Sequence, residues 1–394
     1  MSGARRAAAV ALLVAAAGAC GKKSAAADPV ARGRAAYAKY CATCHGPQAN
    51  GYVADNAPSL RTTSFLSTAT DAFLRAGIVR GRPGTAMAAY GRSYGGPLIP
   101  EDVDAIIAFL RLGGPRPVEL PAHPAVGDAA AGKSVYDALC ARCHGTPTQR
   151  SSAVHLANPV LLSTASDAFL RHAVESGRPP TSMVPWKDTL TPKQLDDVLT
   201  YLRSMATPPP PPPPLAPLAG PAQPRPGPIV LNPKGRAPDF KLKEDLYVSI
   251  DDVKRALDEK RRLIIADARA PSDYGMLHIT GAISTPYYEH KSLDDVPNDG
   301  TWVLAYCACP HHVSGQVVEE LRKRGYKHTA VIDEGIFAWQ QKGYPVVAAP
   351  TMPAIPAPPP PRAPSAPTTQ GVPAPRGVPP HPLPSPRPLP SPHP

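Results

Sequence analysis

The short motif Cys-x-x-Cys-His occurs twice in this chain of 394 residues, at residues 41–45 and again at residues 140–144. Two cysteines at this spacing can add their thiols to the two vinyl groups of a haem, and the adjacent histidine then reaches the iron. The same sequence pattern also occurs in redox dithiols and in half of a zinc site. Because each copy lies in a longer repeated stretch, we interpret the motifs as two sites of covalent c-type haem attachment. The attachment residues are then Cys41, Cys44, Cys140 and Cys143.

Each motif is followed by two further repeated segments, which lie at the same distance from each other in both copies. Residues 71–75 and 167–171 both read Asp-Ala-Phe-Leu-Arg. Residues 81–87 and 177–183 come after them and read Gly-Arg-Pro-Gly-Thr-Ala-Met and Gly-Arg-Pro-Pro-Thr-Ser-Met. Each haem motif therefore has its own downstream methionine.

These two methionines are predicted to be the second axial ligands. A thioether opposite the histidine completes a six-coordinate iron, raises its reduction potential and leaves no open site. We therefore expect His45 to pair with Met87, and His144 with Met183. Methionines more often fill a core, but these two lie in loops rich in proline and glycine rather than on an apolar stripe.

Three other residues have side chains that can bind haem iron. Met205 ends a helical pattern and is interpreted as packing. His155 and His172 are rival ligands for the second haem, but neither has a counterpart in the first repeat. We expect both to be surface or hydrogen-bonded histidines.

The flanks of each motif predict small helical domains. Asp28 and Asp128 each stand before a helix that runs into the first cysteine of a pair, and Asp is a favourable N-cap residue. A second helix ends each repeat and should pack on the first one beside the haem. Its apolar positions follow an i, i+3, i+4, i+7 pattern, in Val103, Ile106, Ile107 and Leu110 and again in Leu195, Val198, Leu199 and Leu202.

Residues 29–113 and 125–206 each resemble a class I cytochrome c domain, an all-α fold. The resemblance implies axial ligation by His45 with Met87 and by His144 with Met183, and a role in carrying single electrons between redox partner proteins. A dihaem peroxidase is the alternative among haem proteins. It needs an iron that can release its distal ligand, and two intact methionine loops argue against it.

The first twenty residues have the pattern of a bacterial export signal. Two arginines precede an apolar run that ends at Cys20 and is too short to span a bilayer as a mature helix. Residues 17–20, Ala-Gly-Ala-Cys, resemble a lipobox, in which Cys20 is acylated. The same letters suit ordinary signal peptidase, which releases a soluble protein. We favour a lipid anchor on the periplasmic side of a bacterial membrane, because Cys20 is otherwise an odd thiol in an exported chain.

Proline separates the remaining parts of the chain. Residues 207–238 contain an unbroken proline run and are predicted to be a spacer in the extended polyproline conformation. Residues 350–394 are again rich in proline, alanine and serine and are predicted to be disordered.

Residues 239–348 form a third predicted unit with an α/β pattern. Residues 263–267 and 302–306 read as buried strands, and residues 251–259 and 314–324 as helices, which implies a parallel sheet. The second of these strands leads through Cys307 into a helix that we expect Ser314 to cap. Backbone N–H groups of such a loop form an anion cradle, which would lower the pKa of a cysteine.

This unit resembles the rhodanese family over essentially its whole length. The segments that carry the resemblance are residues 267–269, 278–283, 333–339 and 343–345. Cys307 stands where the family has its nucleophile, which in active members takes up a sulfane sulfur as a persulfide and passes it to an acceptor. The resemblance therefore implies a sulfane-sulfur donor and acceptor as partners.

The loop after Cys307 departs from the common rhodanese pattern. It is about one residue longer than usual and contains no arginine, which makes phosphatase chemistry unfavourable. Cys309 is a second candidate for the nucleophile, or a partner that resolves a persulfide or sulfenic acid on Cys307. The alternative for the whole unit is a catalytically inactive binding module, because fold does not establish function.

The net charge of +11 does not indicate a nucleic-acid partner. The chain has no basic recognition helix or aromatic platform, so we interpret the charge as a docking surface for acidic redox partners or anionic lipids. The combined prediction is an exported dihaem cytochrome c joined to a rhodanese-like domain, with sulfur chemistry at Cys307 coupled to the haems. A plain electron shuttle with an inactive docking module, and a redox or sulfide sensor, are the alternatives.

Overall fold

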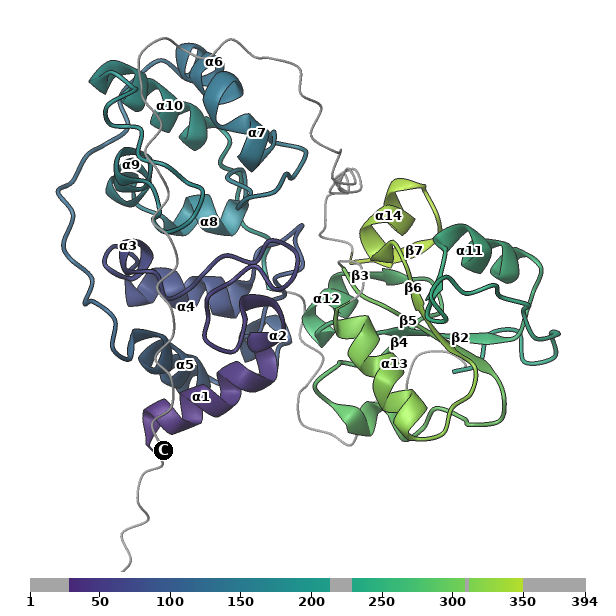
Figure 1. Cartoon of the computed structure of the whole chain (residues 1–394). Helices are drawn as coiled ribbons and strands as arrows, with labels where there is room; N and C mark the ends of the chain where they lie inside the picture. Colours follow the sequence, from purple (N-terminus) through teal and green to yellow (C-terminus); the bar gives the residue numbers. More distant parts are fainter. Residues whose placement is uncertain (1–27, 213–228, 309–311, 350–394) are drawn as a thin grey trace, which may run out of the picture. The chain divides into compact units, whose positions relative to one another are not determined.

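The computed structural model describes residues 28–212, 229–308 and 312–349 (Figure 1). The predicted signal with Cys20, most of the proline spacer, Cys309 and the tail lie outside the described residues. No helix among the described parts is long and apolar enough to cross a membrane.

The first two predicted units are helical, and their elements follow one another in the same order. The first repeat contains α1 (Pro29–Tyr40), α2 (Ala42–His45), α3 (Thr63–Leu66), α4 (Asp71–Arg80), the 3-10 helix η1 (Arg92–Tyr94) and α5 (Pro100–Arg111). The second contains α6 (Ala129–Leu139), α7 (Ala141–His144), α8 (Pro159–Thr164), α9 (Asp167–Ser176) and α10 (Pro192–Ser204).

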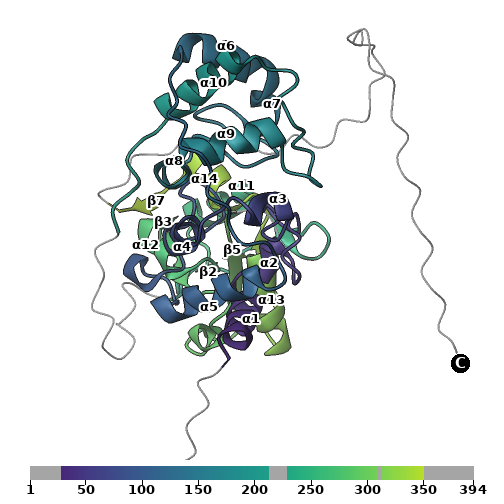
Figure 2. The same cartoon turned by 90° about the vertical axis from the view of Figure 1, so that its left-hand side faces the viewer.

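In each repeat the first and last long helices cross at a glycine. Figure 2 shows these pairs, α1 with α5 and α6 with α10. A Cβ atom on Gly33 would overlap the backbone carbonyl of Ala105, and one on Gly132 would overlap that of Asp197. The two backbones approach so closely that only glycine fits at the crossing. The predicted packing of the terminal helices on the first ones is therefore confirmed, with a glycine contact that the apolar pattern did not reveal.

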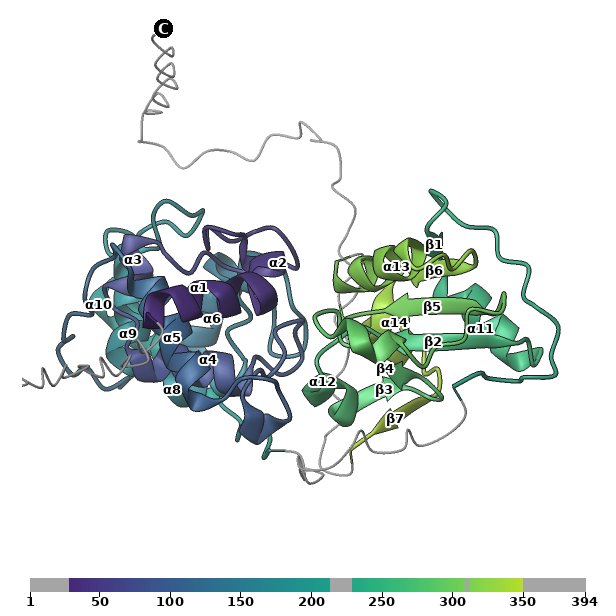
Figure 3. The same ribbon diagram turned by 90° about the horizontal axis from the view of Figure 1, so that it is seen from below.

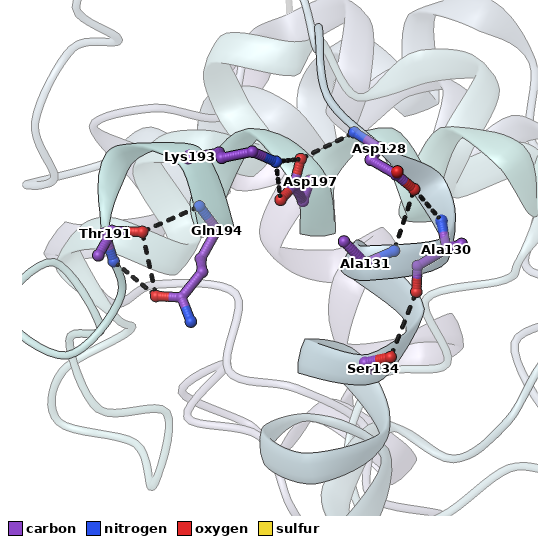
Figure 4. A network of polar contacts seen from close by, with 8 residues as sticks. All are labelled: Asp128, Ala130, Ala131, Ser134, Thr191, Lys193, Gln194 and Asp197. Carbon is purple, nitrogen blue, oxygen red and sulfur yellow. Dashed lines mark hydrogen bonds and ion pairs between the residues drawn. The ribbon is translucent and has the colours of Figure 1, made fainter.

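Side-chain caps fix the ends of the helix pair in the second repeat (Figure 4). The carboxylate of Asp128 accepts hydrogen bonds from the backbone N–H groups at the start of α6. The hydroxyl of Thr191 accepts one from the N–H of Gln194, whose side chain accepts one in return from the N–H of Thr191. The buried Asp197 joins the two ends, since it accepts from the Asp128 N–H at 2.8 Å and pairs with Lys193 at 2.7 Å.

An arginine near the end of each last helix bonds back to the chain before the middle helix. Arg111 donates to the carbonyls of Leu66 and Ala69 and pairs with Asp71. Arg203 donates to the carbonyls of Leu162 and Ala165, each at 2.6 Å, and pairs with Asp167. These bonds satisfy carbonyls that would otherwise lack a partner at the end of a short helix.

The two repeats bury their apolar side chains in one continuous cluster. Phe73 of α4 lies against Phe169 of α9 with ring centroids 4.9 Å apart, and both residues occupy the same place in the repeated sequence. The two helical repeats therefore share a core.

The third unit contains a parallel sheet, as predicted. Its five strands lie in the order β1-β6-β5-β2-β4, and every neighbouring pair is parallel. The strands are β1 (Tyr247–Val248), β2 (Leu263–Asp267), β4 (Ile283–Ser284), β5 (Trp302–Tyr306) and β6 (Thr329–Ile332). A separate antiparallel pair is formed by β3 (Leu277–Ile279) and β7 (Val346–Ala348). The helical elements are α11 (Ile250–Asp258), α12 (Pro271–Met276), η2 (His290–Leu293), α13 (Val313–Lys323) and α14 (Gly335–Gln341).

Helices cover both faces of this sheet (Figure 3). Alternate residues of a strand point to opposite faces. In β2, Leu263 and Ile265 pack in the cluster that contains residues of α11 and α14, whereas Ile264 and Ala266 pack in the cluster that contains residues of α13. Burial on both sides explains why this strand is a continuous apolar run rather than an alternating one.

Two details of this unit differ from the prediction. Helix α13 begins at Val313, so Ser314 lies inside the helix and does not cap it. The chain also reaches the sheet earlier than expected, because Leu231 forms a bridge with Leu263 through two backbone hydrogen bonds.

The helix crossings lead to a stability prediction. Replacing Gly33 or Gly132 by Ala should destabilise the helical region by roughly 1–3 kcal/mol, because the added methyl group forces two backbones apart. Thermal unfolding followed by calorimetry on the full chain measures the effect.

Gly315 is the matched control for this measurement. It also lies within a helix, α13, but a Cβ there would meet nothing within 4 Å. Gly315→Ala should therefore be neutral or slightly stabilising. Equal losses in all three variants would contradict the close approach at the crossings.

Candidate functional site

Each Cys-x-x-Cys-His motif forms a tight turn at the end of a long helix. The N–H of Cys41 donates to the carbonyl of Tyr37, and the N–H of His45 donates to the carbonyl of Cys41 at 3.0 Å. The second motif repeats these bonds, from Cys140 to Tyr136 and from His144 to Cys140. The prediction that each motif closes a helix is confirmed.

The histidine of each motif is oriented by a backbone carbonyl. Nδ1 of His45 lies 2.8 Å from the carbonyl oxygen of Pro58, and Nδ1 of His144 lies 2.7 Å from that of Val154. A carbonyl only accepts hydrogen bonds, so Nδ1 carries the proton and Nε2 keeps its lone pair. Burial lowers the pKa of both histidines, which favours the neutral form that binds a metal.

In each repeat, a tyrosine of the first helix is hydrogen-bonded to the glycine that follows the cysteine motif. The hydroxyl of Tyr37 donates to the carbonyl of Gly46 at 2.8 Å, and that of Tyr136 donates to the carbonyl of Gly145 at 2.9 Å. Both rings are almost fully buried. The cysteine motifs alone do not predict this role for Tyr37 and Tyr136, although each tyrosine stands four residues before the first cysteine of its motif.

The predicted methionine ligands lie in loops that are closed by the same hydrogen bond. The N–H of Arg82 donates to the carbonyl of Met87, and the N–H of Arg178 donates to the carbonyl of Met183, both at 2.8 Å. A threonine hydroxyl in each loop accepts a bond from the methionine N–H. The glycine that opens each loop has a φ of 65°, a left-handed conformation in which a side chain would collide with the loop.

The rival ligands occupy other environments. Nε2 of His155 lies 2.9 Å from the carbonyl oxygen of Thr146, in agreement with a hydrogen-bonded histidine. Met205 packs against the apolar cluster of the helical region. His172 lines a small surface cavity beside Leu120 and Arg171.

These residues fit a covalently held haem. Each repeat supplies two thiols, one imidazole whose free nitrogen is Nε2, and one thioether in a separate closed loop, which is the donor set of a six-coordinate c-type haem. Across the described residues, no group of three or more His, Cys, Asp or Glu side chains could hold a metal ion. When bound, haem iron of this type cycles between ferrous and ferric states and carries one electron.

Cys307 lies directly after β5, at the end of the parallel sheet where its α/β pattern predicted a reactive loop. Its side chain is 2% exposed, and Sγ lies 3.3 Å from the hydroxyl oxygen of Ser314. Its carbonyl accepts a hydrogen bond from the N–H of Ile336 at 3.0 Å. Ser314 is therefore placed to contact the sulfur rather than to cap α13.

A buried ion pair anchors the strand that carries Cys307. Arg269 contacts Asp267 at 2.6 Å, and Tyr306 donates its hydroxyl to the same carboxylate at 2.6 Å. Burial alone would lower the pKa of Arg269, but the carboxylate raises it above its ordinary value. The signature at residues 267–269 is therefore structural: its charges fix the residue that precedes Cys307.

The loop that follows Cys307 is only partly described. Cys309 lies outside the described residues, and the described chain resumes at His312, the N-cap residue of α13. The roles predicted for Cys309, as nucleophile or as resolving partner, remain predictions.

Family comparisons agree with the geometry of both regions. Residues 28–110 and 127–202 match the model of cytochrome c oxidase, cbb3-type, subunit III. Residues 249–342 match the model of the rhodanese-like domain. The chain carries cytochrome c domains and a rhodanese-like domain. The domain combination read from the sequence is therefore confirmed, and cytochrome c domains of this type imply covalently bound haem c.

Curated relatives resemble the cytochrome region. The chain is 34% identical over 131 residues to the cbb3-type cytochrome c oxidase subunit CcoP of Azospirillum sp. strain B510, a match that covers 30% of this chain and 40% of that protein. It is 30% identical over 196 residues to the subunit of the same name from Azospirillum brasilense, covering 45% and 62%. This cytochrome and rhodanese-like chain thus spans about half the length of the curated relatives that it matches.

One solved structure similar to part of this chain is described as rhodanese with anions from E. coli, with 30% identity, coverage of 21% of this chain and 95% of that chain, and a TM-score of 0.19.

The ion pair at Asp267 yields a stability prediction. Asp267→Asn should destabilise the rhodanese-like domain by about 3–5 kcal/mol, because it leaves the Arg269 cation buried without its partner. Chemical denaturation followed by tryptophan fluorescence reports on this domain, since Trp302 and Trp339 lie within it.

Asp258→Asn serves as the control. This carboxylate is also paired, with Lys254, but it is exposed, so its loss should change stability by less than about 0.5 kcal/mol. A similar small effect at both positions would show that Asp267 does not hold the strand.

Proposed function

We propose that the chain is an exported electron carrier with two haems c, held at Cys41 and Cys44 and at Cys140 and Cys143. The observation that carries this proposal is the pair of Nδ1-to-carbonyl contacts, at His45 and His144, each of which leaves Nε2 for an iron. The proposed domains are residues 29–113 and 125–206. Within them, His45 with Met87 and His144 with Met183 are the axial pairs.

The protein's own residues keep these sites ready for electron transfer. The carbonyls of Pro58 and Val154 fix the tautomer and orientation of the histidines. The hydrogen bonds that close the methionine loops fix the backbone at Met87 and Met183. A site of this kind changes little between oxidation states, which suits a carrier rather than a peroxidase.

We also propose that the rhodanese-like domain, residues 239–348, handles sulfane sulfur at Cys307. The support is the position of this thiol after β5 and its 3.3 Å contact with the Ser314 hydroxyl. Sulfur held there is oxidised, or is delivered to a sulfur-oxidising partner, and the electrons leave through the haems. The competing proposal is a plain shuttle whose third domain only docks a partner.

The proposed location is the periplasmic side of a bacterial membrane, with a lipid anchor at Cys20. The support is the signal-like sequence of residues 1–20 and the name of the relatives, which are oxidase subunits. The proposed partners are redox proteins that receive single electrons.

The axial assignment predicts a spectroscopic result. Met87→Ala and Met183→Ala should each convert one haem from low-spin to high-spin and lower its reduction potential, because the iron loses its thioether ligand. Optical and paramagnetic resonance spectra of the purified full chain measure the change.

Met205→Ala is the matched control, since Met205 packs in the core and is not a proposed ligand. It should leave both haems low-spin. If Met87→Ala and Met183→Ala also left both haems low-spin, the axial assignment would be wrong.

The sulfur proposal is tested by anaerobic reduction of the oxidised protein. Thiosulfate or a persulfide should reduce the haems of the wild type, and Cys307→Ser should lose at least tenfold of this rate because the nucleophilic sulfur is missing. If thiosulfate or a persulfide reduced the haems of Cys307→Ser at the wild-type rate, the proposed coupling would be wrong.

Deletion of residues 239–348 separates the two proposals for the third domain. A plain shuttle keeps its reaction with a small-molecule oxidant and never reduces its haems with thiosulfate. In a coupled protein, thiosulfate reduces the haems of the full-length chain. This reaction is lost when residues 239–348 are deleted or when Cys307 is replaced by Ser. Stopped-flow absorbance at the haem bands measures both reactions.

A further inference from the structure

The methionine loop of each repeat accepts a hydrogen bond from the other repeat. The hydroxyl of Ser64 in the first repeat donates to the carbonyl of Pro179 at 2.9 Å. The side-chain amide of Asn158 in the second repeat donates to the carbonyl of Pro83 at 3.0 Å. Pro83 and Pro179 occupy the same place in the repeated sequence. These two bonds are nearly equivalent, so this part of the contact treats the two haem sites alike.

An ion pair between the same two repeats is not symmetric. The carboxylate of Asp55, which follows the first cysteine motif, lies 2.8 Å from the guanidinium of Arg150, which follows the second. The exposed fractions of these two side chains are 21% and 15%. A partly buried pair is screened less than an exposed one, so its charges act on the groups around it.

Each charge of this pair is attached to a different haem site. Oδ2 of Asp55 accepts a hydrogen bond at 3.3 Å from the N–H of Ala86, the residue before the first proposed methionine ligand. Arg150 directly follows Gln149, whose carbonyl accepts a hydrogen bond at 2.9 Å from the N–H of Thr146. Thr146 stands two residues after the proposed histidine ligand of the second haem. The negative charge therefore belongs to the first site and the positive charge to the second.

The charge of Arg150 also acts on a histidine of the second site. Nε2 of His155 lies 2.9 Å from the carbonyl oxygen of Thr146. Burial lowers the pKa of this histidine, and the positive charge of Arg150 lowers it further. The guanidinium thus influences the second haem site while it contacts Asp55.

Charges that are matched between the repeats cannot make the two haems differ. The ion pairs Arg111–Asp71 and Arg203–Asp167 occupy the same places in both copies, so they act on both sites alike. Asp55 and Arg150 instead place opposite charges at the two sites. Ferric haem carries one more positive charge than ferrous haem, so a carboxylate nearby lowers the reduction potential and a cation raises it.

We propose that the Asp55–Arg150 ion pair orders the potentials of the two haems, lower at the first and higher at the second, so that electrons pass from the first to the second. This inference rests on the proposed haem attachment and adds a direction to it. One electron leaves the ferrous iron of the first haem and reduces the ferric iron of the second, and no bond is made or broken. Asp55 and Arg150 tune the two sites and are not ligands. The second haem is then the one that reduces the acceptor protein.

The test measures the potential of each haem in the full-length holoprotein, by NMR at a series of poised potentials. Each reduced low-spin haem shows a methyl resonance of its own methionine ligand, and Met87→Ala and Met183→Ala assign the two resonances. In the wild type, the first haem should be oxidised at a lower potential than the second.

Neutral variants of the pair should narrow the gap between the two potentials. Asp55→Asn should raise the potential of the first haem, and Arg150→Gln should lower that of the second. Each should decrease the equilibrium constant for transfer from the first haem to the second about threefold, or about 28 mV for one electron. Asp55 has a φ of 44°, a left-handed conformation that asparagine also tolerates, so this variant removes the charge without new backbone strain. Asp55→Glu and Arg150→Lys keep the charges and should keep most of the gap.

Asp104→Asn and Lys133→Gln are the controls, because each removes a charge of the same sign from an exposed ion pair of the same repeat. They should leave the gap unchanged. An unchanged gap in Asp55→Asn and Arg150→Gln, equal shifts in the controls, or a higher potential at the first haem of the wild type would overturn the proposal and leave the carrier function intact. Wild-type protein without haem would instead refute the carrier function.

Discussion

The close crossing of two helices at one glycine is the constraint on which each cytochrome c domain depends. Gly33 lets α1 lie directly against the backbone of α5, and Gly132 does the same for α6 and α10. Because α1 and α6 run straight into the cysteine motifs, the crossing also fixes where those motifs turn. The buried tyrosine and the oriented histidine then follow within the next turns of chain.

The duplicated domain offers an internal comparison of what is required and what is free to vary. Both copies keep the crossing glycine, the tyrosine under the motif, the carbonyl that holds the histidine, and the hydrogen bond that closes the methionine loop. At the helix crossing they differ, since the residue opposite the glycine is Ala105 in one copy and Asp197 in the other. The carboxylate of Asp197 ties two helix starts together, which is a local way of stabilising the same geometry.

In the rhodanese-like domain, the charged residues that stabilise the fold are different from the residue that is proposed to react with sulfur. Asp267, Arg269 and Tyr306 form a buried network that satisfies its members and holds the end of β5. Cys307 follows that fixed point, and Gly335 lies so close beneath it that a Cβ there would come within 2.6 Å of the Cys307 carbonyl oxygen. Because the buried network fixes the end of β5, residues in the loop after Cys307 can be substituted without loss of the fold.

The sequence by itself determined the domain types, because repeated cysteine motifs, strand-like apolar runs and helix periodicity are local signals. It predicted β2 and β5 at residues 263–267 and 302–306, and the structure has strands with these bounds. It did not show that Ser314 faces the sulfur of Cys307, since a serine before a helix reads as a cap. Nor did it show the carbonyl partners of His45 and His144, or the bonds that Nη1 of Arg178 donates to Ser64 and Thr68 in the other repeat. Those contacts join residues that are apart in sequence, and only tertiary packing decides which polar groups are buried and which partners they find.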